Sequence, residues 1–360
     1  MKIIRLITSA YALLVLLFFA SCLNKRPKIA IEAPKASDQK TTSTHAMVVF
    51  VHGTMLPLPN VSASFSSLKQ SLSRGRHTNK SWYQLYLDQL KTKSVYHYQP
   101  LGAEGLHQIV DQPAACIAAS MFTELLPNSC SCYTFGWNGR LDQTNRQQAA
   151  EKLYLQLLAE VENLQKKFEN VELLLIGHSH GGNVLLNLAQ AEETHKKNLS
   201  IDKLVLLGTP IQTETAHYVA APCFKKVYNF YSTGDKIQKL DRLSTSKKSH
   251  RKLQHHNKLI QIKLLCGKKK PGHADLFMFG ASGNWLYSNR LAIEPFPVFV
   301  FLPIILPVLD TQYATAPSIL LTIEKDGHGL RFLFSNQKHS YATTLNASLL
   351  KKYRKQIRNL

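Results

Sequence analysis

The stretch Gly177-His178-Ser179-His180-Gly181-Gly182 lies between an apolar run over residues 171–176 and a helix-compatible run over residues 183–191. Glycines on both sides of the serine let the backbone turn sharply between a strand and a helix, which exposes the serine hydroxyl above the edge of a sheet. The five-residue pattern alone occurs by chance, so the flanking signals carry most of the weight. The stretch predicts that Ser179 is a nucleophile. The alternative is a glycine-rich turn that only joins a strand to a helix.

Short apolar runs alternate with helical patterns along the rest of the chain. The first run, residues 47–51, is rich in β-branched residues, as is typical of a strand buried on both faces of a parallel sheet. Similar runs cover residues 94–98, 132–137, 171–176, 204–207, 227–231 and 259–265, and the clearest helical patterns cover residues 145–168 and 183–195. We therefore expect an α/β fold with a mostly parallel central sheet and helices on both faces. A site in such a fold lies at the carboxyl ends of the strands.

A serine hydroxyl becomes a nucleophile only when a base takes its proton, and that base is usually a histidine oriented by a carboxylate. Asp235 follows the run over residues 227–231 through a short Ser-Thr-Gly segment. Its carboxylate would therefore lie on a loop at the same sheet edge as Ser179. We predict Asp235 as the acid, and the alternative is an aspartate that caps a turn.

Two histidines are candidates for the base. We prefer His273, because it follows the run over residues 259–265 through a loop that would end at the edge carrying Ser179. The second candidate, His328, lies in the turn of a predicted hairpin. Three further histidines precede the last core strand in a lysine-rich segment, where cations would repel a divalent metal ion: His250, His255 and His256.

With these residues in place, the chain resembles an α/β-hydrolase of the lipase and esterase type over about residues 46–289. The order Ser179, Asp235, His273 is that family's order of nucleophile, acid and base. Three further segments resemble the same family: Phe135-Gly136-Trp137-Asn138-Gly139, Leu206-Leu207-Gly208-Thr209-Pro210 and the doublet Gly181-Gly182.

The resemblance also implies an oxyanion hole. His52-Gly53-Thr54 follows the first predicted strand and is similar to the family's HG-x motif. The implied donors are the backbone amides of Thr54 and His180. The alternative for His52-Gly53 is a plain turn that ends a strand. Trp137 is either a core aromatic or part of the substrate pocket.

The amino terminus has the pattern of a secretory signal. Residues 1–5 are basic, residues 6–19 are apolar but too short for a comfortable membrane span, and small residues precede Cys22. Phe19-Ala20-Ser21-Cys22 resembles the bacterial lipobox, which implies a lipidated Cys22 at the mature amino terminus. Because Phe19 replaces the usual leucine, the alternatives are ordinary cleavage with release and an uncleaved anchor.

The predicted organisation is a signal peptide over residues 1–21, a tether over residues 22–45, an α/β-hydrolase domain over residues 46–290 and a small, β-rich extension over residues 291–360. Residues 55–93 form a long segment that contains prolines, which favours a cap over the site. Residues 296–309 are apolar, but three prolines argue against a membrane helix and for a broken strand or packed extension. Residues 319–334 predict a β-hairpin.

Composition limits the partners. The net charge is +21, and residues 236–270 hold twelve lysines and arginines opposed only by Asp241. This segment lacks the interleaved aromatics that stack on bases, and an exported chain seldom meets nucleic acid, so we expect an anionic membrane surface as the partner and no nucleic acid. The alternative is a solvated loop. Besides Cys22, five cysteines form no C-x-x-C pair, so we expect small buried residues, with one disulfide as the alternative.

These observations together predict an exported, lipid-anchored serine hydrolase that cleaves carboxylic esters, with lipids as the leading substrate class. The chemistry needs no metal or organic cofactor. The same three residues would also serve an acyltransferase or an amidase. Outside the enzymes, the alternative is a catalytically silent lipoprotein that binds an anionic surface or a partner. The acyl length and the oligomeric state are not indicated.

Overall fold

The computed structural model describes residues 41–53, 105–108, 113–126, 128–240, 249–277, 291–294 and 296–358. The chain divides into two units, Met1–Gln39 and Lys40–Leu360, and every described residue belongs to the second. The following predicted features lie outside the described residues: the signal peptide, the lipobox, residues 22–40 of the tether, the cap over residues 55–93, the strand over residues 94–98 and Thr54.

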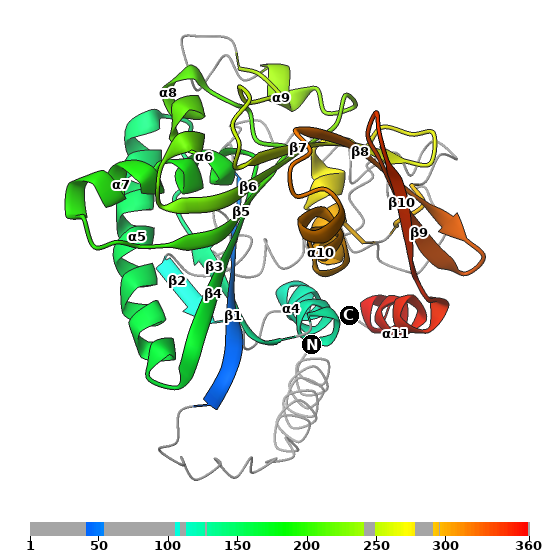
Figure 1. Ribbon diagram of the computed structural model, residues 1–360, viewed down its shortest axis with the longest axis horizontal. Helices are drawn as coiled ribbons and strands as arrows, with labels where there is room; N and C mark the ends of the chain where they lie inside the picture. Colours follow the sequence, from blue (N-terminus) through cyan, green and yellow to red (C-terminus); the bar gives the residue numbers. More distant parts are fainter. Residues whose placement is uncertain are drawn as a thin grey trace, which may run out of the picture. The chain divides into compact units, whose positions relative to one another are not determined.

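The described strands form one ten-stranded sheet in the order β10-β9-β8-β7-β6-β5-β4-β1-β3-β2 (Figure 1). All neighbours from β8 to β3 in this order are parallel, whereas β2 at one edge and the β8-β9-β10 meander at the other are antiparallel. The bounds are β1 Thr41–Val51, β2 Gly105–Gln108, β3 Ser129–Gly136, β4 Phe168–His178, β5 Ile201–Leu207, β6 Phe224–Tyr231, β7 Leu259–Cys266, β8 Ser318–Asp326, β9 Gly329–Ser335 and β10 Ser340–Leu345.

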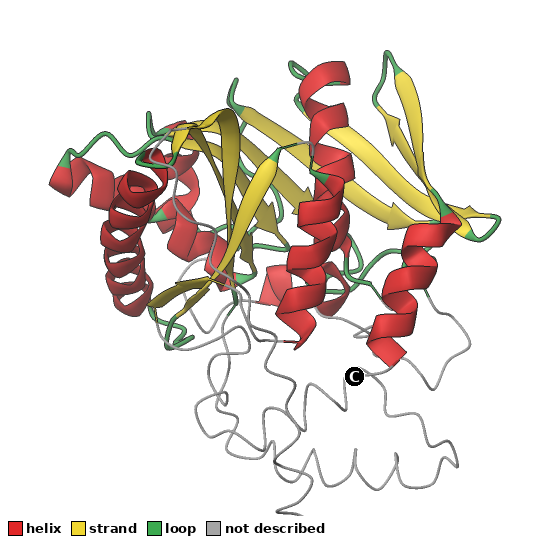
Figure 2. Ribbon diagram, turned by 90° about the horizontal axis from the view of Figure 1, so that it is seen from below, coloured by secondary structure: helices red, strands yellow, loops and turns green. Residues whose placement is uncertain are grey.

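Helices cover both faces of this sheet (Figure 2). Figure 1 shows α5, α6 and α7 on one face and α4, α10 and α11 on the other. The helical bounds are α4 Pro113–Leu125, α5 Gln143–Gln165, α6 His180–Leu186, α7 Leu188–His195, α8 Thr213–Ala216, η2 His217–Ala220, α9 Ile237–Leu240, η3 Ala274–Leu276, η4 Val298–Phe301, α10 Leu302–Gln312 and α11 Ala347–Arg358. The expected α/β fold is confirmed.

The alternation of side chains along β1 produces two separate hydrophobic cores. Met47, Val49 and Val51 pack with α5, α6 and α7, whereas Val48 and Phe50 pack with α4, α10 and α11. Successive residues of a strand point to opposite faces, so a continuous apolar run fills both cores at once. This is why the short apolar runs of the sequence correctly located the central strands.

Two elements differ from expectation at their boundaries. β1 begins at Thr41 and not at Met47, because His45 is buried, stacks on the ring of Phe168 and bonds the hydroxyls of two serines on β3, Ser129 and Ser131. The predicted helix over residues 183–195 is two helices, α6 and α7, with a break at Asn187. The side-chain amide of Asn187 donates to the carbonyl of Asn183 at 2.7 Å.

The extension over residues 291–360 continues the main sheet through β8, which pairs in parallel with β7. The predicted hairpin is confirmed as β8 and β9. Of the two alternatives for residues 296–309, the broken strand is wrong and the packed extension is confirmed: η4 and α10 occupy this stretch and bury its apolar side chains. Pro303 falls in the first turn of α10, where its missing N–H has no cost, and buried apolar packing overrides Pro307 within the helix.

Within the described residues, no helix is long and apolar enough to cross a membrane. Four cysteines, Cys130, Cys132, Cys223 and Cys266, are free thiols, and the last three are buried. Cys132, Cys223 and Cys266 therefore match the expected small buried residues, whereas Cys130 is half-buried, and none of the four is in a disulfide.

Candidate active site

Ser179 occupies a strained turn between β4 and α6. Its φ of 53° lies in the left-handed region, which is unfavourable for a residue with a side chain. The Ser179 amide donates to the carbonyl of Leu207 at 2.9 Å, and the Ser179 carbonyl accepts from the amide of Gly182 at 3.0 Å. Strain of this kind persists only where the surrounding structure over-determines it, and it concentrates at functional sites.

The glycines around Ser179 permit two backbone segments to meet. A Cβ on Gly181 would lie 2.4 Å from the carbonyl oxygen of His52 and 2.5 Å from that of Val51, so the α6 backbone packs directly on the end of β1. A Cβ on Gly53 would lie 2.6 Å from the Cβ of Ser179. The segment after β1 therefore passes immediately beside the Ser179 side chain.

Asp235 and His273 form a direct pair at the same edge of the sheet. His273 Nδ1 lies 2.7 Å from Asp235 Oδ2, and the Asp235 side chain is fully buried, whereas that of His273 is 13% exposed. Because a carboxylate only accepts, Nδ1 is the donor, and Nε2 then carries the lone pair. The other carboxylate oxygen, Oδ1, accepts a hydrogen bond from the backbone N–H of Gln238 at 3.2 Å and so caps the first turn of α9.

Ser179 is linked to this pair through the end of β5. A Cβ on Gly208 would lie 2.9 Å from Asp235 Oδ2 and 3.4 Å from His273 Nδ1, and Leu207 next to it accepts the amide of Ser179. Ser179, Asp235 and His273 therefore lie around the same turn at the end of β5. Ser179 and His273 make no hydrogen bond to each other, a link that often tightens only when substrate binds.

His178 connects the nucleophile turn to the histidine loop, a contact that the sequence reasoning missed. Its Nε2–H donates to the backbone carbonyl of His273 at 3.1 Å. Its ring stacks on Phe277, with centroids 5.1 Å apart, and Phe277 in turn contacts Phe299 of η4 at 4.8 Å. Burial lowers the pKa of His178 well below its usual value, which keeps the ring neutral. The extension thus supports the loop that carries His273.

His52 fixes the segment after β1. Its Nδ1–H donates to the carbonyl of Gly53 at 2.7 Å, and its Nε2 accepts the backbone N–H of Trp137 at 3.2 Å. The indole N–H of Trp137 returns a bond to the His52 carbonyl at 2.9 Å. Trp137 is 2% exposed, so it belongs to the core and holds this turn from beneath. Complete burial lowers the pKa of His52 to about 4.

The loop of Asp235 has two further supports that the sequence reasoning missed. Arg251 donates its guanidinium to the backbone carbonyl of Asp235, and Gln238 donates its side-chain amide to the carbonyl of Thr209 at 3.0 Å. Gln238 lies three residues after Asp235, the spacing of a helix cap, and this signal was readable in the sequence. Nothing in the sequence identified Arg251.

The other candidate histidines form no hydrogen bond with Asp235, whose side chain bonds His273 and Gln238. His328 is exposed in the β8–β9 turn, and β8 is four strands from β4, a separation of about 19 Å. His250 and His255 are exposed, and His256 is half-buried. His180 is the first residue of α6, three residues before the expected start of this helix, and its implied oxyanion partner Thr54 is outside the described residues.

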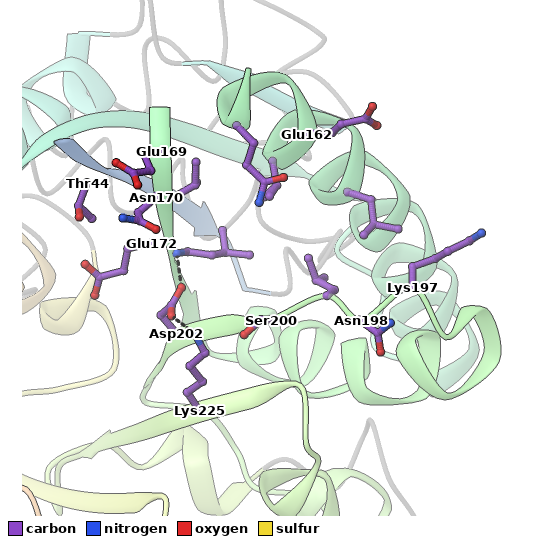
Figure 3. A pocket seen from close by; sticks show the side chains of 16 residues that line it. Thr44, Glu162, Glu169, Asn170, Glu172, Lys197, Asn198, Ser200, Asp202 and Lys225 are labelled. Atoms are coloured by element: carbon purple, nitrogen blue, oxygen red, sulfur yellow. Dashed lines mark hydrogen bonds and ion pairs between the residues drawn. The ribbon is translucent and has the colours of Figure 1, made fainter. Parts of the chain in front are cut away.

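A large polar groove lies at the opposite, amino-terminal edge of the sheet (Figure 3). It is lined by the starts of β4, β5 and β6 and by the end of α5, and β4 places it about 30 Å from Ser179. Its inner carboxylates are paired: Glu172 with Lys203 at 2.7 Å, and Asp202 with Lys225 at 2.6 Å. The groove contains none of the predicted site residues. In the described part of the chain, no group of three potential ligand side chains could hold a metal ion.

Comparison with known proteins adds little to this geometry. No family model matches the sequence, and no curated protein matches it. One solved structure of similar extent is a cell surface hydrolase from Lactobacillus plantarum WCFS1, a designation that is itself provisional. It is 15% identical to this chain over 79% of this chain and 82% of that chain, with a TM-score of 0.23. At this TM-score the likeness carries no argument.

Proposed function

We propose that this chain is a serine hydrolase that cleaves carboxylic esters through an acyl-enzyme formed on Ser179. The observation that carries the proposal is the 2.7 Å contact between His273 Nδ1 and the buried Asp235 carboxylate, beside the strained turn that holds Ser179. A nucleophile, a base and an orienting acid are the minimum that this chemistry needs.

In the proposed reaction, His273 Nε2 takes the Ser179 proton as Oγ attacks the carbonyl carbon of the ester. The imidazolium, stabilised by Asp235, then protonates the leaving alcohol, and the acyl group stays on Ser179. In the second half, a water molecule gives a proton to His273 Nε2 as its oxygen attacks the acyl carbon. His273 then returns this proton to Ser179 Oγ as the bond between Oγ and the acyl carbon breaks, and the carboxylic acid leaves. Asp235 holds the imidazole tautomer throughout.

The tetrahedral intermediates need donors for the oxyanion, each of which is worth about 3 kcal/mol. We assign these roles to the backbone amides of His180 and Thr54. The assignment is supported by the position of His180 at the start of α6 and by the bonds through which His52 and Trp137 hold Gly53 beside Ser179.

Lipids are the substrate class we favour, and we propose that the enzyme is exported and anchored through Cys22. The proposed substrate class and the proposed anchoring rest on the sequence of the first 45 residues and on the basic charge of the chain. Cys22→Ser should stop incorporation of labelled fatty acid and leave an unprocessed precursor. Normal processing of this variant would point to an ordinary signal peptidase and a released enzyme.

The reaction class is tested by following p-nitrophenyl butyrate with residues 40–360, which hold the whole sheet and both hydrophobic cores. We expect release of p-nitrophenol and free butyrate in equal amounts. Transfer of butyrate to an added alcohol or amine in preference to water would make the protein an acyltransferase. Absence of turnover together with absence of labelling by a fluorophosphonate would contradict the proposal and favour a silent surface-binding protein.

A further inference from the structure

We propose that the loops carrying Asp235 and His273 form a docking surface for an anionic lipid bilayer, with Ile237 as its apolar anchor. The surface consists of Lys236, Ile237, Arg251, Lys252, Lys268, Lys269 and Lys270. It is a binding property and not a catalytic one. Only its consequence, delivery of a lipid ester to Ser179, rests on the proposed function.

Among the described residues, Ile237 is the exposed large apolar residue of this surface. It is 51% exposed at the start of α9, two residues after Asp235. The other large hydrophobic side chains exposed in the described residues are Leu155 on α5 and Tyr341 on β10. A single exposed isoleucine is ordinary on a protein surface, so its surroundings decide its meaning.

Those surroundings are cationic, and they come from three loops that touch. A Cβ on Gly234 would lie 2.4 Å from the carbonyl oxygen of Lys270, so the Asp235 loop packs on the lysine-rich turn after β7. Lys236, Lys268 and Lys270 are all exposed. They make no ion pair in the described part of the chain.

The third loop adds two cations through contacts with the same framework. Arg251 donates to the backbone carbonyl of Asp235, and exposed Lys252 lies 5.5 Å from the ring centroid of Tyr231, the last residue of β6. Neither partner is anionic, and within the described residues Arg251 and Lys252 make no ion pair.

Two described carboxylates nearby, Asp235 and Asp275, are held by other groups. Asp235 is buried and bonded to His273. Asp275 is half-buried and accepts the amide of Gly272 at 2.7 Å. The charge therefore faces outward and attracts anionic headgroups, an attraction that salt screens over about 10 Å.

The apolar anchor selects a bilayer over a dissolved polyanion. An exposed isoleucine among lysines gains nothing from a nucleic acid or a sulfated polysaccharide, but it gains burial when the lysines meet lipid headgroups. Tyr231, whose ring lies beside Lys252, is 4% exposed, so it offers no platform on which a base could stack.

The test is co-sedimentation of residues 40–360 with vesicles of phosphatidylglycerol and phosphatidylcholine or of phosphatidylcholine alone, at low and high salt. The surface variant replaces Lys236, Lys268 and Lys270 by Gln. The matched control replaces three exposed lysines of the β9–β10 turn and α11: Lys338, Lys351 and Lys355. We expect binding to anionic vesicles only, weakened about 10-fold or more in the surface variant and less than 2-fold in the control.

Ile237→Ser should weaken binding several-fold, whereas Leu155→Ser, which removes a similarly exposed side chain, should not. Equal losses in the two lysine variants would overturn the proposal, because net charge alone would then explain binding. Tight binding to heparin without binding to anionic vesicles would also overturn it. The same measurement on Ser179→Ala separates docking from catalysis. Ser179→Ala should still bind the anionic vesicles, whereas the surface variant, which binds them weakly, should still hydrolyse p-nitrophenyl butyrate.

Discussion

His273 Nδ1 lies 2.7 Å from Asp235 Oδ2, although 38 residues separate the two in the sequence. The contact forms because β6 and β7 are parallel neighbours, so the loops that leave their carboxyl ends meet above the same edge of the sheet. Ser179 leaves β4 at this edge, and the strand between β4 and β6 contributes Gly208, whose lack of a side chain leaves room for the pair.

Replacing His273 by Ala should lower kcat on the order of 10³-fold, because Ser179 loses its base. His328→Ala serves as the control and should leave kcat unchanged, since His328 is exposed about four strands away. Both are measured with a soluble p-nitrophenyl ester. A large loss in His328→Ala with activity retained in His273→Ala would reverse the assignment.

His178 should act as a positioning residue for His273. His178→Phe keeps a ring against Phe277 but removes the donor to the His273 carbonyl, a bond worth about 1 kcal/mol. We expect kcat to fall about 5- to 10-fold at nearly constant KM. His178→Gln, which retains a donor, should recover most of the loss. If Gln and Phe behave alike, the role of His178 is only to fill space.

Gly181 should tolerate no side chain. Glycine to alanine within a helix ordinarily stabilises it, but a Cβ here would lie 2.4 Å from a backbone oxygen that cannot move aside. We expect Gly181→Ala to cost at least about 3 kcal/mol of unfolding free energy. A Cβ on Gly267 would meet no atom within 4 Å, so Gly267→Ala should lower the free energy of unfolding by only about 1 kcal/mol, because φ is positive at this position. Equal melting temperatures of the Gly181→Ala and Gly267→Ala variants would contradict the close packing of Gly181 on the end of β1.

His52 should make the fold sensitive to acid. Its pKa falls from 6.5 to about 4 on folding, so between these values the unfolded chain holds a proton that the folded chain lacks. Stability is therefore lost as the pH falls from 6.5 to 4, by on the order of 3 kcal/mol from this residue. In urea unfolding, the free energy of unfolding of His52→Asn should fall less steeply between pH 6.5 and pH 4 than that of the original chain. An unchanged slope would mean that His52 does not titrate in this window.

The sequence predicted the central strands well because a parallel sheet demands continuous apolar runs, such as residues 47–51 and 259–265. It also predicted that Asp235 and His273 would share an edge, since both follow such runs. For residues 296–309 it left a broken strand and a packed extension open, and the three prolines hid the helix α10 that the structure contains. In the structure, Lys226 at 2.8 Å and the hydroxyl of Tyr228 hold Asp310 near the end of α10.

Other features could not be predicted because they depend on three-dimensional neighbours. The bond from His178 to the His273 carbonyl joins residues 95 positions apart, and the chain from Phe277 to Phe299 links the site to the extension. The pairing of β8 with β7 likewise has no local signal, since a hairpin sequence does not specify which strand it joins.

The most direct test of the account is active-site labelling of residues 40–360 with a fluorophosphonate, followed by peptide mass spectrometry. We predict one labelled residue, Ser179, with labelling and ester hydrolysis both abolished in Ser179→Ala at a nearly unchanged melting temperature. Ser129→Ala, which removes the hydroxyl that bonds His45 near the start of β3, should label normally. Label on another residue, or hydrolysis that survives in Ser179→Ala, would contradict the assignment of Ser179 as the nucleophile.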